Sequence, residues 1–152
     1  MKIVEFLRPE AVLADVSGAT GAAALAELCR PLAAAQRVDP QKLLETLLER
    51  EKLGSTGIGD GVAIPHGKVA GLPGLIASFG RAPGGVDFRA IDGKPTYLFF
   101  TLFAPENSAG AHLKALARIS RIFKNPAFRE TILAAPDAAA IYRLIEAEDS
   151  KY

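Results

Sequence analysis

Apolar residues recur at helical spacing in the first and last thirds of the chain, whereas the middle alternates short apolar runs with turns. Eleven of the 14 glycines lie between residues 54 and 93, so this middle region is built of strands and turns. Helices on either side of a strand-rich middle indicate an α/β fold with one mixed sheet covered by helices. We see no domain boundary, internal repeat or low-complexity tract, and expect residues 1–152 to form a single domain.

Two helices are predicted before residue 54. Thr20 is a plausible N-cap for an alanine-rich helix, and Pro31 should kink or end that helix. Asp39-Pro40 is a stronger start signal, because an N-cap is followed by proline at the first helical position. The second helix then runs over Gln41–Lys52, with an apolar face formed by Leu43, Leu44, Leu47 and Leu48.

The predicted strands are short and are bounded by glycine and proline. Arg8-Pro9 marks a break, and Val12–Val16 forms a short strand after it. Leu75–Phe79 is a strand between glycines, and Val86–Phe88 is a short extended piece. Thr96–Phe103, with the sequence TYLFFTLF, is the most apolar run and predicts a central strand buried on both faces.

Three helices are predicted in the last third of the chain. Either residue of the pair Asn107-Ser108 can cap a helix over about Ala109–Phe123. Its inward face contains residues at helical spacing, namely His112, Leu116, Ile119 and Phe123. Asn125-Pro126 and Pro136-Asp137 introduce two short closing helices. The tail, Glu148–Tyr152, is polar, and we expect it to fray.

Composition narrows the classes of function without selecting one. The net charge is +1, which gives no electrostatic case for binding nucleic acid or an acidic membrane. No apolar run approaches about 18 residues, so no transmembrane helix is expected, and the N-terminus has no signal-peptide pattern. Cys29 is the only cysteine, which fits a reducing cytoplasm, and its place in a helix rich in alanine and leucine favours buried packing.

The stretch most suggestive of chemistry is Gly54–Lys68, which reads GSTGIGDGVAIPHGK. Four glycines fall within eight positions, and a short apolar run follows them. Pro65 then places His66 at the end of an extended segment, because proline fixes its own φ and restricts the backbone of the preceding residue to extended conformations. Gly67 removes the Cβ beside the histidine.

This arrangement suits an exposed imidazole on a fixed backbone. A neutral imidazole is a nucleophile at physiological pH, and bare N–H groups of a glycine-rich loop favour anions. A histidine beside an anion site suggests that His66 itself carries a phosphoryl group. On spacing alone, a glycine-rich turn with a surface histidine explains the pattern equally well.

The motif STGIGDGVAIPHGK resembles the phosphorylation-site signature of enzyme IIA proteins of the fructose/mannitol/nitrogen type, from the bacterial phosphoenolpyruvate-dependent phosphotransferase system. It is most similar to the freestanding nitrogen-regulatory branch, IIA-Ntr. The resemblance covers nearly the whole chain, including the KIVEFLRPE start, the DGKP turn, the LFFTLFAP strand and the helix that opens with His112. It implies a small mixed parallel and antiparallel sheet with helices on both faces.

The resemblance also implies three site residues. His66 would accept a phosphoryl group on Nε2, with its other ring nitrogen donating to a backbone carbonyl. Arg50, sixteen residues before His66, would pair with the phosphoryl oxygens, although a cation there also complements the end of its helix. His112 would donate a hydrogen bond to the phosphoryl group. Without the family, His112 is better explained as a core-edge histidine satisfied by a backbone carbonyl.

Further residues of the motif remain open. Ser55, Thr56 and the N–H of Gly59 are possible additional phosphoryl-binding groups, but serine and threonine here are more often turn-formers. Lys68 would point to the same side as His66 and attract a phosphoprotein, or it is simply solvated. Asp60 would repel a phosphoryl group, unless it holds Arg50 or His112 in place.

The resemblance implies a donor of the HPr type, NPr in the nitrogen branch, and a regulatory target or a IIB-type acceptor. Targets in the nitrogen branch include potassium-transport and signalling proteins. We expect Ile58, Val62 and Ile64 to form an apolar docking patch for a short-lived interface. No metal and no cofactor is implied, since two histidines without a cysteine or carboxylate cluster make a poor zinc site.

The leading hypothesis is a cytoplasmic phosphocarrier with regulatory output, because this chain contains no fused IIB or IIC segment. A standalone sugar-specific IIA subunit is the alternative. A binding module that has lost phosphotransfer is a further possibility, although His66, Arg50 and His112 are all present. A conventional kinase or hydrolase is disfavoured by the absence of a Walker-type loop and of a nucleophile elbow.

Overall fold

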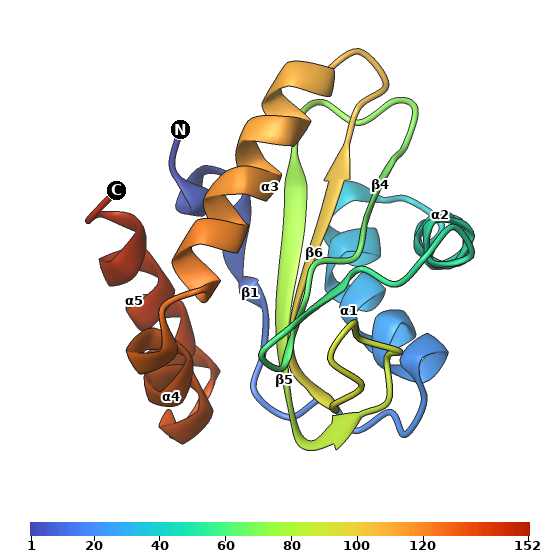
Figure 1. Ribbon diagram of the computed structural model, residues 1–152. Helices are drawn as coiled ribbons and strands as arrows, with labels where there is room; N and C mark the ends of the chain where they lie inside the picture. Colours follow the sequence, from blue (N-terminus) through green and yellow to red (C-terminus); the bar gives the residue numbers. More distant parts are fainter.

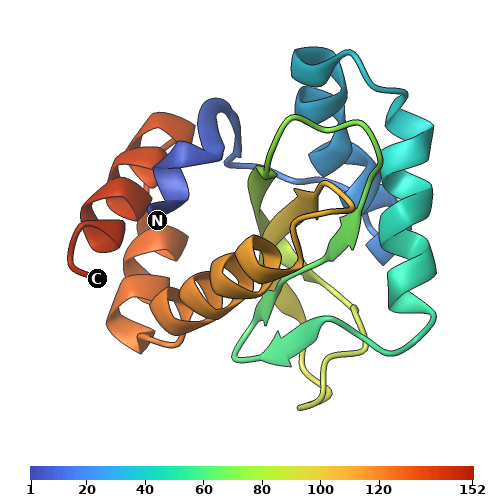
Figure 2. The same ribbon diagram turned by 90° about the horizontal axis from the view of Figure 1, so that it is seen from above.

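The computed structural model describes residues 1–152, and it places one mixed sheet between two layers of helices (Figure 1 and Figure 2). This confirms the predicted fold class. The helices are α1 (Gly21–Gln36), α2 (Pro40–Glu51), α3 (Ala109–Phe123), α4 (Pro126–Ala134) and α5 (Ala138–Asp149). The strands are β1 (Leu7–Leu13), β2 (Gly57–Gly59), β3 (Val62–Ala63), β4 (His66–Lys68), β5 (Ile76–Val86) and β6 (Thr96–Ala104), and a 3₁₀ turn, η1 (Ile3–Glu5), precedes them.

Strand β6 lies at the centre of the sheet, as its continuous apolar sequence predicts. The order is β1-β5-β6-β3-β2, and β4 pairs with β6 beyond β3. Strands β3 and β4 both run parallel to β6, whereas β5 runs antiparallel to it. One edge of β6 is therefore completed by two short strands from the glycine-rich motif, and the second of them begins at His66.

The two faces of the sheet are covered by different helices. Helices α1 and α2 lie over one face, and α3, α4 and α5 lie over the other (Figure 2). Between the layers is a core of 39 buried apolar residues, in which Phe79 stacks on Phe123 with ring centroids 5.6 Å apart. None of the five helices combines the length and apolar character that crossing a membrane requires.

The helix starts agree with their sequence signals except at α3, where Ser108 occupies the N-cap position without a side-chain hydrogen bond. Thr20 accepts a hydrogen bond from Ala23 N, and Asp39 caps α2 by accepting one from Gln41 N. Pro31 does not end α1, because the helix continues to Gln36. A proline costs a helix one backbone hydrogen bond, and α1 buries its leucine face against the sheet and α2, which offsets that loss.

Two of the predicted strands differ in extent from the observed β1 and β5. Pro9 does not break the chain but lies within β1, where the pairing with β5 shifts between Leu7 and Val12. Proline is tolerated there because β1 is an edge strand. Gly80 likewise does not end a strand, since β5 runs through it to Val86. A methyl group at Gly80 would come within 2.6 Å of side-chain atoms of Leu28 and Val16, so this glycine permits close packing of α1.

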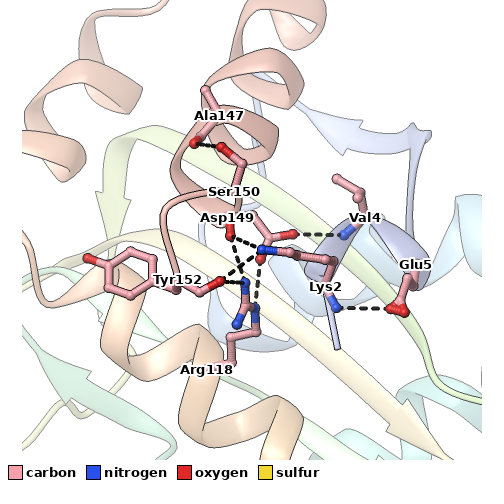
Figure 3. A network of polar contacts seen from close by, with 8 residues as sticks. All are labelled: Lys2, Val4, Glu5, Arg118, Ala147, Asp149, Ser150 and Tyr152. Carbon is pink, nitrogen blue, oxygen red and sulfur yellow. Dashed lines mark hydrogen bonds and ion pairs between the residues drawn. The ribbon is translucent and has the colours of Figure 1, made fainter.

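The C-terminal tail is held in place, and the prediction that it frays is wrong (Figure 3). Asp149 is buried, and its Oδ1 accepts a hydrogen bond from Arg118 Nε at 2.7 Å. Lys2 Nζ and Arg118 Nη2 both donate to the main-chain oxygens of Asp149 and Tyr152. These contacts join α3, α5 and the start of the chain, so the order of the tail comes from partners more than 30 residues away in sequence.

Candidate functional site

His66 lies at the start of β4, where the sequence predicts an extended segment. Its residue pairs with Leu102 of β6 in parallel register, and Leu102 N donates to Pro65 O at 2.9 Å. The backbone on both sides of the ring is therefore fixed by the central strand. The side chain is half-buried, so the ring is supported on one side and open to a partner on the other.

The hydrogen bonding of the His66 ring defines its tautomer. Nδ1 lies 2.7 Å from Ile64 O. A carbonyl oxygen only accepts, so Nδ1 of the neutral ring must carry the proton and Nε2 must carry the lone pair. This is the tautomer that nucleophilic attack by Nε2 requires.

His112 lies in the first turn of α3, beside His66. The two ring centroids are 5.5 Å apart, with an angle of 76° between the ring planes. His112 is buried, and its Nε2 is closed off from solvent without a hydrogen-bond partner. A buried imidazole nitrogen without a partner is uncommon in folded proteins and marks a place where a ligand group can be bound.

The surroundings lower the pKa of both histidines. Burial is the main cause for His66, and the nearby charge of Arg50 acts in the same direction, against the Ile64 carbonyl and Glu51. For His112, burial again lowers the pKa most, followed by the charges of His66 and Lys68. Both rings are therefore neutral at physiological pH, which leaves the lone pair of His66 Nε2 available.

We expect both histidines to titrate below their ordinary pKa of 6.5. As the pH falls, the unfolded chain binds these two protons before the folded chain does. The stability they contribute is then complete above pH 6.5 and is lost as the pH falls below that value. NMR titration of the ring protons and urea unfolding at about pH 7.5 and 5.5 measure both effects. His112→Gln should remove part of the pH dependence, and a His66 midpoint at or above 6.5 would contradict the expectation.

Arg50 comes to the site from the last turn of α2. Its Nη1 donates to Gly54 O at 3.0 Å, which holds the guanidinium against the start of the glycine-rich motif. A Cβ on Gly67 would lie 2.5 Å from Thr46 Cγ2. The glycine after His66 thus lets α2 pack directly on β4. This packing places Arg50, at the end of α2, close enough to His66 for its charge to act on the ring.

The hydroxyls of Ser55 and Thr56 are both engaged within the loop. Ser55 Oγ donates to Phe88 O at 2.6 Å and accepts from Gly57 N. Thr56 Oγ1 donates to Glu51 Oε2 at 2.5 Å. Each hydroxyl has a single proton to donate, so neither has one left for a group on His66 in this conformation.

Asp60 and Gly61 form the tight turn between β2 and β3, and both have positive φ, 57° and 76°. This is the two-residue turn that an Asp-Gly pair favours in hairpins. Asp60 N donates to Asp92 Oδ2, and the Asp60 carboxylate forms no hydrogen bond or ion pair with Arg50 or His112. Gly59 pairs with Val62 in this hairpin, so the hairpin explains its position without a role in binding a phosphoryl group.

The exposure of the side chains around the two histidines agrees with the prediction for Lys68 and Ile58 but not for Val62 and Ile64. Lys68 is exposed and is close enough to His112 to act on its pKa. Val62 and Ile64 are buried, so the predicted apolar patch is wrong for both, because β3 and the residue after it lie inside the sheet. Leu53 and Leu113 are instead 84% and 68% exposed, next to the segments that carry Arg50 and His112.

Glu51 was not singled out from the sequence. Its carboxylate accepts from Thr56 N and from the Thr56 hydroxyl, and it thereby closes the loop that follows α2. A sequence signal existed, since an acidic residue ends the helix a few positions before a Ser-Thr pair. A hollow of about 770 Å³ between α4 and α5 includes neither histidine.

Comparisons with known proteins agree with this geometry. Residues 5–148 match the family model described as phosphoenolpyruvate-dependent sugar phosphotransferase system, EIIA 2. The chain is 40% identical to the nitrogen regulatory protein of Bradyrhizobium diazoefficiens, and the alignment covers 95% of each chain. It is 35% identical to the fructose-specific EIIABC component of Bacillus subtilis, but that match covers 24% of the longer protein. The crystal structure of IIA-Ntr from Neisseria meningitidis aligns with a TM-score of 0.88 at 34% identity, covering 94% of this chain and 98% of that one.

Proposed function

The chain belongs to the enzyme IIA type 2 family of the phosphoenolpyruvate-dependent phosphotransferase system, and we propose that it is a phosphocarrier that accepts a phosphoryl group on Nε2 of His66. The observation that carries this proposal is the Nδ1 contact of His66 with Ile64 O at 2.7 Å, which leaves Nε2 with its lone pair. The donor is a phosphohistidine carrier protein of the HPr or NPr type. No cofactor takes part.

The step is a direct transfer between two nitrogen atoms. The Nε2 lone pair attacks phosphorus while the phosphorus–nitrogen bond of the donor histidine breaks, and that electron pair returns to the donor ring. His66 keeps its Nδ1 proton throughout, and the Ile64 carbonyl stabilises the positive charge that develops on the phosphorylated ring. Such transfers have a loose transition state, so the protein acts mainly by positioning groups and by stabilising charge.

Arg50 and His112 supply that stabilisation in our proposal. The Arg50 guanidinium pairs with the phosphoryl oxygens, a role that suits its planar donors. Nε2 of His112 has no hydrogen-bond partner within the protein, which supports a contact with a bound group. A neutral ring that is protonated on Nε2 donates to a phosphoryl oxygen. Lys68 adds positive charge from the exposed side. We do not assign Ser55 or Thr56 to the phosphoryl group, since their hydroxyl protons are used elsewhere.

The output is regulatory in our proposal. Phosphorylation of His66 reports to target proteins of the nitrogen branch, including those related to nitrogen and potassium. Support comes from the relatives named nitrogen regulatory protein, which match this chain over nearly their full length. The match to one part of a fructose-specific EIIABC component favours the alternative, a sugar-type IIA subunit that passes the phosphoryl group to a IIB partner.

The test is incubation with phosphoenolpyruvate, enzyme I and either an NPr-type or an HPr-type carrier, followed by intact mass measurement. We expect one acid-labile phosphoryl group, formed faster with the NPr-type carrier. Offering the phosphorylated protein to a fructose-type IIB separates the two outputs, because fast transfer to IIB would favour the sugar branch. Absence of phosphate with either carrier would reject the phosphocarrier role and leave a binding module.

Arg50→Ala should slow phosphorylation of His66 about 100-fold, because one charged donor to the transferring group is lost. Arg50→Lys should recover only part of the rate, since an ammonium group cannot bind two oxygens in a fixed plane. Rapid-quench measurement with the cognate carrier gives both rates. Lys52→Ala is the matched control, because Lys52 follows the same helix and pairs only with the exposed Glu49. An Arg50→Ala rate within about threefold of wild type would remove Arg50 from the site.

A further inference from the structure

A chain of hydrogen bonds connects the end of α2 to the His66 ring. Glu51 Oε1 accepts from Thr56 N at 3.0 Å, and Oε2 accepts from the Thr56 hydroxyl at 2.5 Å. Thr56 O then accepts from Ile64 N at 3.1 Å. Ile64 O accepts from His66 Nδ1 at 2.7 Å. Each residue in this series of hydrogen bonds thus fixes the position of the next, from the end of α2 to the His66 ring.

We propose that Glu51 is a positioning residue for His66, which acts through Thr56 and Ile64 to hold the ring with its proton on Nδ1 and its lone pair on Nε2. The inference rests on the proposed function, since a fixed tautomer matters when Nε2 is the acceptor. Glu51 itself does not touch the phosphoryl group in this proposal.

The residues joined by these hydrogen bonds have little freedom to move. Thr56 is 5% exposed, and its main-chain bond to Ile64 extends the antiparallel pairing of β2 with β3. Pro65 restricts the backbone between Ile64 and His66. At the other end of this series of hydrogen bonds, the Glu51 carboxylate holds Thr56 by accepting two hydrogen bonds, one from its N–H and one from its hydroxyl. Hydrogen bonds to a charged acceptor are stronger than neutral ones, so Glu51 makes the decisive contribution there.

A purely structural role for Glu51 makes a different prediction. A carboxylate that only closes the loop after α2 would affect the free energy of unfolding and leave the His66 ring unchanged. Burial lowers the pKa of the His66 ring most, and the Glu51 charge raises that pKa through space, separately from the hydrogen bonds through Thr56 and Ile64. The ring is therefore the place to look for the difference.

The test measures the His66 ring nitrogens by NMR at about pH 8, where the ring is neutral and the tautomer is visible in their chemical shifts. Wild type should show the Nδ1–H form. Glu51→Ala should shift a substantial fraction to the Nε2–H form, and Glu51→Gln should show a smaller shift. Thr56→Val, which loses only the hydroxyl bond, should resemble Glu51→Gln, whereas Thr56→Ser should restore the wild-type signals.

Phosphorylation rates and the pKa of His66 in the variants test the same proposal by a second route. The Glu51→Ala protein should be phosphorylated about tenfold more slowly at saturating carrier, the lower end of the cost known for losing a residue that orients a metal-binding histidine. The His66 pKa should fall in Glu51→Gln, because a charge that raises it is removed. A lower pKa makes the neutral ring only a slightly weaker nucleophile, because bonding to the incoming phosphorus is weak in a loose transition state, so a tenfold slower rate reports lost positioning. Glu49→Gln is the matched control, since it removes one exposed charge from the same helix and should change neither quantity.

The outcomes separate this inference from the proposed function. Glu51 and Thr56 variants that fold, yet keep the wild-type ring signals and rate, would reduce Glu51 to a loop contact and overturn the inference. Circular dichroism and thermal unfolding verify the fold of each variant, and Thr56→Ser against Thr56→Val keeps the test decisive if Glu51→Ala does not fold. If wild type accepts no phosphoryl group, the carrier role fails, while a tautomer shift in the variants still supports the positioning of the ring.

Discussion

Replacing His66 by glutamine should abolish phosphorylation of the protein. The backbone at this position stays paired with Leu102 of β6, so the fold is retained, but the site loses the ring nitrogen that attacks phosphorus. No second acceptor is available in its place. His112 is 7% exposed and its Nε2 is closed off from solvent, so this ring is a poor direct acceptor from a phosphorylated carrier. Intact mass after incubation with phosphoenolpyruvate, enzyme I and the carrier should show no added phosphoryl group.

His112→Gln is the matched control, because it makes the same chemical change at the neighbouring ring. This variant should still take up one acid-labile phosphoryl group, at a reduced rate. The two variants thus distinguish an acceptor from a group that stabilises the transferring phosphoryl. An acid-labile phosphate on the His66→Gln protein would move the acceptor to His112 and reverse the two roles.

Much of the fold is readable from the sequence where local signals suffice. The starts of α2, α4 and α5 are each marked by an N-cap beside a proline, and the caps form the predicted hydrogen bonds. The continuous apolar run of β6 predicts its central place in the sheet. These features depend on residues adjacent in sequence, and local chemistry decides them.

The errors occur where distant residues decide the local structure. Pro9 and Gly80 are read as breaks, yet each lies inside a strand. Gly80 pairs with Phe99 across the sheet, and Pro9 lies in the stretch of β1 where the pairing with β5 shifts. The tail from Glu148 is read as frayed, yet its Asp149 is buried against Arg118. Polarity alone does not indicate whether a charged residue finds a partner on another element.

The residues of the candidate site show the same contrast between local signals and distant contacts. The motif itself indicates His66 as an exposed ring on a fixed backbone, and the structure places Arg50 and His112 around it. The apolar surface is misread, because Val62 faces the core from an interior strand, and burial depends on the neighbours of that strand. Glu51 is missed for a related reason, since its hydrogen-bond connection to His66 passes through two other residues, Thr56 and Ile64.

Replacing Arg118 by alanine should lower the free energy of unfolding by about 3–5 kcal/mol, the cost expected when a buried ion pair loses one partner. The Asp149 carboxylate is 1% exposed, so it would remain in the interior with only Val4 N, at 3.4 Å, among the contacts shown in Figure 3. Arg118 also binds two main-chain oxygens at the end of the chain, and those contacts are lost with it. Urea unfolding followed by circular dichroism measures the change.

Arg121→Ala is the matched control for this large effect. Arg121 lies one turn further along α3, is exposed, and contacts the ring of Tyr152 with its guanidinium 4.8 Å from the ring centre. Its removal should cost no more than about 1 kcal/mol. The double variant Arg118→Ala, Asp149→Ala should recover part of the loss, because no buried charge is then left unpaired. An Arg118→Ala protein as stable as the Arg121→Ala protein would show that the tail contributes little to the fold, and that its polar contacts only replace those with water.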